Sequence, residues 1–273
     1  MPRTVISYGG GVQSTAMLVL AAQGAIDSTE ALFCNVGDDS EAVETLRYVR
    51  EIAIPYAAAH GIAVHEIRRT RRDGTTPTLL EYHLEQVERT GATPLPVKMQ
   101  GAGDGGIANR TCTVEWKAKP VRQWLRKHGA TKAAPVHLAL GISTDEIHRA
   151  NNRNDQPYEL RTFPLLDLGL SRNDCTAIIR RAGLPVPPKS ACWFCPFIPP
   201  ARLAEMRRDN PARFDAIEAL ETGMNKQRDR LGKVPFYWSS HSGPLGRIEA
   251  KQDTIPGLEP DGPEGCESGS CWT

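Results

Sequence analysis

Two cysteines separated by two residues, Cys192 and Cys195, are the clearest metal-binding signal in the sequence. A Cys-x-x-Cys turn allows both thiolates to reach one metal ion or one iron–sulfur cluster. The best third ligand is Cys112, because it follows a glycine-rich stretch and lies among Arg and Lys residues that favour a thiolate. Three thiolates can hold a [4Fe-4S] cluster and leave one iron open.

Two other interpretations of these cysteines stay open. A structural zinc site needs a fourth cysteine or histidine, for which the candidates are Cys175, His128 and His148. A redox-active dithiol formed by Cys192 and Cys195 needs no metal at all. The residues alone do not separate a cluster from zinc.

A second chemical signal is a run of glycines after the first apolar segment. Residues 4–8 are typical of a buried strand, and Gly9, Gly10 and Gly11 permit a tight turn after it. Residues 16–22 are apolar and helix-forming, and we expect Ser14 or Thr15 to cap that helix. A strand, a glycine loop and a helix N-terminus together form a phosphate cradle, because N–H groups and the helix dipole both attract an anion.

Strands alternate with helices in the first half of the chain. Further strands are predicted over 31–36, 62–67 and 136–140. Helices are predicted over 41–60, with Ser40 as cap and Pro55 as a kink, and over 79–89. This order is typical of a parallel sheet flanked by helices, so we expect an α/β, Rossmann-like fold. Ligands of such sheets bind at the carboxyl ends of the strands, where both the glycine loop and Gly37–Asp39 fall.

The second half of the sequence is mostly helical around the Cys-x-x-Cys motif. A helix capped by Ser171 is predicted to run through Ala182, and two more helices over 201–208 and 211–230. After Gly232 glycine and proline dominate. We therefore expect a nucleotide-binding domain over 1–165, a helical region with the Cys-x-x-Cys motif over 166–232, and an irregular tail over 233–273.

The composition is that of an ordinary globular protein. The 33 basic and 32 acidic residues nearly cancel, so no global field indicates a nucleic acid or a membrane as partner. The basic run Arg68–Arg72 is more typical of a solvated loop than of an anion contact. Because the chain enters its first strand directly after Met1-Pro2-Arg3, we expect no signal peptide and a cytoplasmic protein. In that compartment, seven cysteines favour metal binding or catalysis over disulfides.

The glycine loop also resembles a known family. The segment Ser7-Tyr8-Gly9-Gly10-Gly11-Val12-Gln13-Ser14 is similar to the pyrophosphatase loop (PP-loop) of the adenine nucleotide alpha-hydrolase superfamily, whose commoner form is Ser-Gly-Gly-x-Asp-Ser. Gln13 stands where that form has Asp, a version that sulfonucleotide reductases often carry. The group that the loop resembles most is therefore the phosphoadenosine phosphosulfate reductase-like family.

Three later segments strengthen the resemblance. Asn35–Asp38 resembles the family's second strand end, which lies near the adenosine. Arg110–Pro120 resembles its cysteine–lysine–proline segment, and Gly141–Arg149 its later Gly-x-x-x-x-Glu/Asp-x-x-Arg strand end. The resemblance covers roughly residues 5–197, and the combination is far more specific than any one segment.

The resemblance implies an adenine nucleotide, either ATP or a sulfonucleotide, bound at these segments. The implied nucleotide-binding residues are Ser7, Gly9, Gly10, Gly11, Gln13, Ser14, Thr15, Asn35, Gly37, Asp38 and Gly141. Asp38 or Asp39 would carry Mg²⁺. Lys117 and Arg149 would stabilise charge on the transferring group, the alternative being an ordinary surface ion pair.

The sequence departs from the family pattern at two places. Cluster-bearing adenylylsulfate reductases usually have a Cys-Cys pair where this chain has Thr111-Cys112. Either a distant cysteine supplies the fourth ligand, or one iron is open to hydrosulfide, as is thought for related enzymes that thiolate nucleic-acid bases. Sulfonucleotide reductases end in Glu-Cys-Gly-x-His, which the tail around Cys266 matches only loosely. Cys266 and Cys271 are therefore either catalytic persulfide or resolving thiols, or exposed tail residues.

Three functions are compatible with this resemblance. The favoured one is an ATP pyrophosphatase-type enzyme that adenylates an acceptor and inserts sulfur from a donor with the help of the cluster. Its acceptor would be a tRNA base or a nucleic-acid backbone. The second is a sulfonucleotide reductase that releases sulfite, with Cys266 or Cys271 as nucleophile and a thioredoxin-like reductant. The third is a non-enzymatic nucleotide-binding module with structural zinc. A monomer and a homodimer are both compatible with each.

Overall fold

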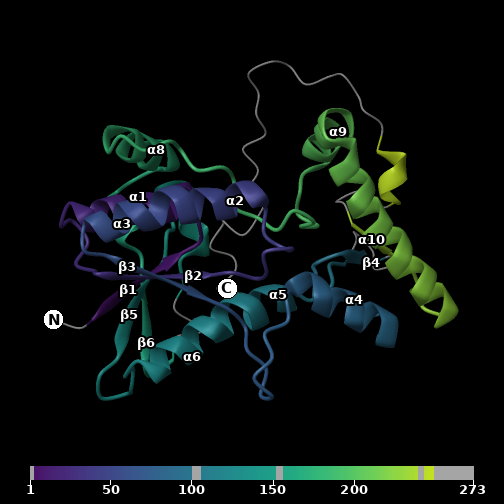
Figure 1. Cartoon of the computed structure of the whole chain (residues 1–273), viewed down its shortest axis with the longest axis horizontal. Helices are drawn as coiled ribbons and strands as arrows, with labels where there is room; N and C mark the ends of the chain where they lie inside the picture. Colours follow the sequence, from purple (N-terminus) through teal and green to yellow (C-terminus); the bar gives the residue numbers. More distant parts are fainter. Residues whose placement is uncertain (1–2, 100–105, 152–155, 239–242, 249–273) are drawn as a thin grey trace. The chain divides into compact units, whose positions relative to one another are not determined.

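The computed structural model describes residues 3–99, 106–151, 156–238 and 243–248, and its contacts divide the chain into two units (Figure 1). Within these described residues, unit 1 comprises 3–78 and 113–193, and unit 2 comprises 79–112 and 194–248. The expected segments 1–165, 166–232 and 233–273 are consecutive, whereas each unit combines separate stretches of chain.

Unit 1 is built on a five-stranded parallel sheet with the strand order β3-β2-β1-β5-β6. The strands are β1 (Thr4–Tyr8), β2 (Glu30–Cys34), β3 (Ala63–Ile67), β5 (Val136–Ala139) and β6 (Glu159–Thr162). In the central strand, Ile6 lies opposite Ala31 of β2 and Ala139 of β5. The expected α/β parallel fold is therefore confirmed, and the four predicted strands are present.

Helices cover both faces of this sheet (Figure 1). On one face, α1 (Val12–Ala22), α3 (Ile54–Ala59) and α8 (Arg172–Arg181) enclose one apolar core. On the other face, α6 (Lys119–Lys127) encloses a second core with β5. Because β1 lies between both cores, Val5 and Ile6 are each fully buried, which explains why this strand reads as a continuous apolar run.

The predicted helix over 41–60 is present as three consecutive segments. They are α2 (Val43–Tyr48), a π-helical turn at Val49–Ala53, and α3. Pro55 lies two residues after the end of this π turn, and proline cannot donate the helical hydrogen bond to the carbonyl four residues earlier. The sequence predicted a kink at Pro55, and the structure has a π turn just before this residue. The expected cap at Ser40 is wrong, since the helix begins after Ala42.

A second π turn, Val114–Ala118, also precedes a proline. It joins the short α5 (Thr111–Thr113) to α6, in which Pro120 occupies the first turn. Val121 and Leu125 of α6 are both buried in the second core. The proline position again explains where the helix departs from α geometry.

The helix α8 begins as predicted, at the cap residue Ser171. The Ser171 hydroxyl accepts a hydrogen bond from the Asp174 N–H, and the Asp174 carboxylate accepts one from the Ser171 N–H. This reciprocal pair satisfies two N–H groups that the first turn leaves without helical partners. Together with buried Ile178 and Ile179, the cap fixes α8 against the core that α1 also lines.

The fifth strand of the sheet, β6, was not predicted. Its four residues alternate between buried Glu159 and Arg161 and the more exposed Leu160 and Thr162. The Glu159 carboxylate accepts a hydrogen bond from the Arg122 Nε at 3.1 Å, which compensates its burial. Because the buried face of this edge strand is charged, hydrophobic periodicity gives no strand signal here.

Unit 2 consists of α4 (Leu79–Thr90), α9 (Pro200–Asp209), α10 (Pro211–Arg230) and a two-stranded pair, β4 (Lys98–Met99) with β7 (Phe236–Tyr237). All three helices were predicted. The buried Trp238 anchors the unit, since its Nε1 donates to the Phe194 carbonyl at 2.7 Å and its backbone N–H donates to the Glu221 carboxylate at 2.6 Å. Among the described residues of the two units, no helix is long and apolar enough to cross a membrane.

Candidate functional site

The glycine loop lies at the carboxyl end of the central strand, as predicted. Gly10 has a φ of +78°, which lets the chain reverse sharply between β1 and α1. A side-chain Cβ at Gly10 would lie 3.1 Å from the side chains of both Thr45 and Val49. Position 10 therefore requires glycine, both because of its positive φ and because of the two neighbouring side chains.

The helix cap differs from the prediction. Gly11, with extended φ and ψ of −102° and −176°, is the N-cap residue of α1, and Ser14 and Thr15 already lie in the first turn. The Ser14 hydroxyl accepts from the Gly11 N–H at 3.2 Å and donates to the Gly11 carbonyl at 3.1 Å. Ser14 thus braces the loop from inside the helix rather than capping it.

Gln13 is almost completely buried in the first turn of α1. Its Oε1 accepts a hydrogen bond from the Arg172 Nη1 at 3.1 Å. No hydrogen-bond acceptor for its Nε2 is found among the described residues, so a buried donor lies at the N-terminus of a helix of 11 residues. Both the donor and the positive end of the helix dipole favour an anion at this position.

The other predicted residues of the loop region take distinct places. Ser7 is half-buried within β1, and the Thr15 hydroxyl lies 3.4 Å from the Tyr8 hydroxyl. Gly141 follows β5, and a Cβ there would lie 3.2 Å from the Ser14 backbone nitrogen. The end of β5 therefore runs against the first turn of α1, which brings these predicted residues together.

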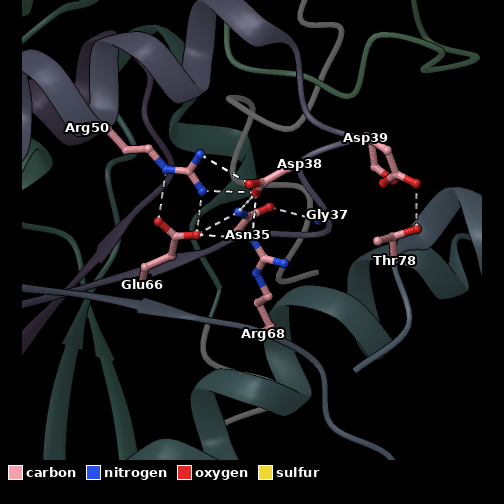
Figure 2. Close-up of polar contacts among 9 residues, drawn as sticks. Asn35, Gly37, Asp38, Asp39, Arg50, Glu66, Arg68 and Thr78 are labelled. Carbon is pink, nitrogen blue, oxygen red and sulfur yellow. Dashed lines mark hydrogen bonds and ion pairs between the residues drawn. The ribbon is translucent and has the colours of Figure 1, made fainter. Parts of the chain in front are cut away.

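A network of charged groups joins the carboxyl ends of β2 and β3 (Figure 2). The Asn35 Nδ2 donates to the Asp38 and Glu66 carboxylates, both at 2.7 Å. Arg50 donates to the same two carboxylates at 2.9 Å, and Arg68 is ion-paired with both. Two carboxylates and two guanidinium groups therefore balance in charge at this edge of the sheet.

These contacts set the protonation of both acids. The hydrogen bond from Arg50 is the main reason that the pKa of Asp38 lies below its usual value. Burial alone would raise the pKa of Glu66, but the hydrogen bonds from Arg50 and Asn35 outweigh it, and the pKa is lowered. Both carboxylates are consequently ionised at neutral pH.

Asp39 and Gly37 form the next part of the same loop (Figure 2). The Asp39 carboxylate accepts hydrogen bonds from the Thr78 hydroxyl at 2.9 Å and the Ser40 hydroxyl at 2.8 Å. Gly37 has a φ of +132°, and a Cβ there would overlap the Thr78 side chain. Asp39 is thus exposed and engaged by hydroxyls, whereas Asp38 is engaged by two guanidinium groups.

The basic run Arg68–Arg72 was interpreted as a solvated loop; Arg68 is exposed, and the first two residues of the run also make specific contacts. Arg68 belongs to the network at the end of β3. The Arg69 guanidinium lies 4.2 Å from the centre of the Trp116 ring and 3.7 Å from the Glu115 carboxylate. These two arginines therefore hold the end of β3 through ion pairs and a ring contact.

Lys117 lies in the π turn before α6, near two buried groups at the end of β2. Burial raises the pKa of the Cys34 thiol to about 12, and Lys117 opposes that effect. Burial also raises the pKa of Glu41, which Lys117 opposes as well. Because Pro120 lacks an N–H, the Trp116 carbonyl loses its α-helical donor, and it accepts from the Cys34 thiol at 2.7 Å.

Arg149 ends the 3₁₀ turn Thr144–Arg149, which follows Gly141. The residue is buried, and its guanidinium is ion-paired with Glu146 at 2.8 Å. Asp145 in the same turn accepts a hydrogen bond from the Arg172 backbone N–H at 2.6 Å. The turn is thereby tied to the start of α8, whose Arg172 also contacts Gln13.

The predicted metal ligands fall in both units. Cys192 belongs to unit 1, whereas Cys112 and Cys195 belong to unit 2. Of the candidate fourth ligands, Cys175 is fully buried in the apolar core beside α1, where burial raises its pKa to about 12. Within the described residues, no group of three or more His, Cys, Asp and Glu side chains is arranged to hold a metal ion. Cys266 and Cys271 lie outside the described residues.

No pattern in the sequence predicts how the segment Ser190–Trp193 is attached. The Ser190 hydroxyl donates to the Gly9 carbonyl at 2.5 Å. The Trp193 backbone N–H donates to the Ser40 carbonyl at 3.1 Å, and its ring Nε1 donates to the Asp39 carbonyl at 2.6 Å. The segment that carries Cys192 therefore contacts both the glycine loop and the loop after β2.

No family model matches the sequence, and no curated protein matches it.

The requirement for glycine at position 10 can be tested by substitution. We expect Gly10→Ala to reduce the free energy of unfolding by about 2–3 kcal/mol, because it combines a positive φ with crowding against two side chains. The matched control is Gly24→Ala, which has a similar φ of +76° but open space around the added Cβ. That variant should lose only about 1 kcal/mol. Urea unfolding of both variants measures the difference, and equal losses would contradict the crowding at Gly10.

Proposed function

We propose that the chain is a PP-loop enzyme that cleaves ATP to adenylate an acceptor and then transfers sulfur to it. The observation that carries the proposal is the attachment of the Cys192 segment to the glycine loop through Ser190 and Gly9. A phosphate-binding element and a cysteine of the Cys-x-x-Cys motif thereby meet at one edge of the sheet. An ordinary nucleotide-binding domain needs no cysteine at this place.

In this proposal the loop and the first turn of α1 bind the phosphates. The backbone N–H groups of Gly9 and Gly10 and the buried Gln13 Nε2 donate to phosphate oxygens, and the positive end of α1 attracts their charge. The Gly11 N–H joins them when it gives up its hydrogen bond to the Ser14 hydroxyl. Asn35 and Gly37, at the end of β2, bind the adenosine. Gly141 allows the end of β5 to lie close to the first turn of α1, because any larger residue would press on the backbone of that turn.

Of the two acids expected to carry Mg²⁺, Asp39 is the better candidate. The Asp38 carboxylate is engaged by Arg50, Arg68 and Asn35, and a metal ion would have to displace them. Asp39 is exposed and accepts only hydroxyl hydrogen bonds among the side-chain contacts described above. Oxygen donors of this kind suit Mg²⁺, which also binds the phosphates and neutralises the leaving pyrophosphate.

The chemistry then proceeds in two displacements. An acceptor oxygen attacks the α-phosphorus, the bond to the bridging oxygen breaks, and pyrophosphate leaves. A hydrosulfide-level sulfur supplied by a donor then attacks the adenylated carbon or phosphorus, and AMP leaves with the original oxygen. Lys117 and Arg149 stabilise negative charge on the transferring group in both steps.

The proposed cluster rests on the residue types predicted from the sequence. Cys112, Cys192 and Cys195 would supply three thiolates, one fewer than a fully protein-bound [4Fe-4S] cluster requires. Cys175 is an unsuitable fourth ligand because it is buried in the apolar core. When bound, such a cluster supplies an open iron at which sulfur is held, whereas zinc would make the site structural.

Product analysis tests the reaction directly. With ATP, Mg²⁺, a sulfide donor and a mixed tRNA or DNA acceptor, the wild-type chain should release AMP and pyrophosphate. Gln13→Glu keeps the acceptor for Arg172 but replaces the Nε2 donor by a carboxylate oxygen, so kcat/KM should fall at least about 100-fold. The matched control is Gln23→Glu at the other end of α1, which should retain activity.

Other product patterns would contradict the proposal. Sulfite released from a sulfonucleotide, without pyrophosphate from ATP, would identify a reductase that uses Cys266 or Cys271. Deleting residues 265–273 should abolish that reductase activity and leave ATP cleavage intact. If neither product forms, the chain is a nucleotide-binding module.

Metal analysis tests the cluster separately. After anaerobic purification we expect iron and acid-labile sulfide in about equal amounts, as in a [4Fe-4S] cluster. Cys192→Ala should lose both, whereas Cys175→Ala should retain them although its core is less well packed. Zinc without labile sulfide would contradict the cluster.

A further inference from the structure

The buried hydroxyl of Ser190 connects two functional segments that are far apart in the sequence. Ser190 is 2% exposed, and it donates to the carbonyl of Gly9, 181 positions earlier. Gly9 is the residue between β1 and the positive-φ turn at Gly10. The hydrogen bond therefore holds the first peptide group of the glycine loop.

Four contacts on the other side of Ser190 hold the cysteine segment against the loop after β2. The Ala42 N–H donates to the Ala191 carbonyl at 3.2 Å, and Glu41 and Cys192 form an antiparallel bridge. Trp193 donates from its backbone and from its ring to Ser40 and Asp39. Cys192 is only 7% exposed in this arrangement, so a reagent reaches its thiol only when the segment opens.

Opening of the segment and rearrangement of the glycine loop are thus physically linked. The segment cannot leave its place without breaking the Ser190–Gly9 hydrogen bond, and that bond constrains the peptide that precedes the Gly10 turn. A nucleotide that binds the closed loop more tightly than the open one stabilises the closed segment by mass action. The coupling free energy is reciprocal, so a change that stabilises the closed position of the Cys192 segment also raises the affinity for the nucleotide.

We propose that Ser190 is a positioning residue that couples nucleotide binding at Gly9–Gly11 to the accessibility of the Cys192 thiol. The coupling rests on the proposed function, because it requires a nucleotide at the glycine loop. Its consequence is that the Cys192 thiol is less accessible while a nucleotide occupies the glycine loop than when the loop is empty.

The rate of alkylation of Cys192 measures this coupling. The full chain is treated with a chelator so that the thiols carry no metal, and is then transferred to a buffer that contains Mg²⁺. It is reacted with iodoacetamide, and modification of Cys192 is followed by peptide mass spectrometry. At an ATP concentration of about 100 times Kd, the wild-type rate should fall at least about tenfold, with a limit of about 100-fold for complete coupling. Isothermal calorimetry on the same sample supplies Kd.

Three variants separate coupling from simple shielding. Ser190→Ala should react faster without ATP, and ATP should change its rate by less than about twofold, although ATP still binds. Ser190→Thr keeps a hydroxyl and should restore part of the slowing. The matched control is Ser28→Ala, which removes another buried hydroxyl that donates to β1, to the Thr4 carbonyl at 2.9 Å, and should leave the slowing unchanged.

Each failure has a separate meaning. If ATP still slows alkylation of Ser190→Ala as much as in the wild type, the nucleotide shields Cys192 directly and the coupling is wrong. If ATP binds to the wild type but does not change the Cys192 rate, the coupling is wrong whatever the variants do. If calorimetry detects no ATP binding, the proposed function fails and the coupling fails with it.

Discussion

The site depends on the central place of β1 in a parallel sheet. With β2 on one side and β5 on the other, the carboxyl end of β1 has neighbouring strand ends on both sides. The chain must therefore change direction directly after β1, and the positive φ of Gly10 makes this turn possible. Asn35 and Gly37 after β2, and Gly141 after β5, are brought to the loop by strand order alone.

Charge balance is the second constraint on this edge of the sheet. Two ionised carboxylates, Asp38 and Glu66, would repel a polyphosphate if they stood alone. Arg50 and Arg68 neutralise them, and Asn35 fills the position between them. These contacts hold the loop after β2 while the two acids are neutralised, which suits the proposed phosphate site beside it.

Local patterns predicted the parts of the fold that local forces determine. The apolar run of β1 and the cap at Ser171 have strong local signals, and both are present. The strand β6 was missed because its buried face carries Glu159 and Arg161, which only a partner such as Arg122 makes tolerable. The Ser190–Gly9 contact could not be predicted, since no periodicity relates residues 181 positions apart. The cap at Gly11 was missed because serine is the more common cap residue, whereas here the Ser14 side chain bonds to the backbone of Gly11.

In the proposed function, Gly9–Thr15 bind a nucleotide and residues 190–193 respond to it. Amide hydrogen exchange of the full chain, with and without saturating ATP and Mg²⁺, tests both parts in one measurement. We predict slower exchange in peptides that cover 9–15 and 190–193, and unchanged exchange in α10. Unchanged exchange in the glycine loop while ATP is bound, or protection confined to unit 2, would contradict the claim.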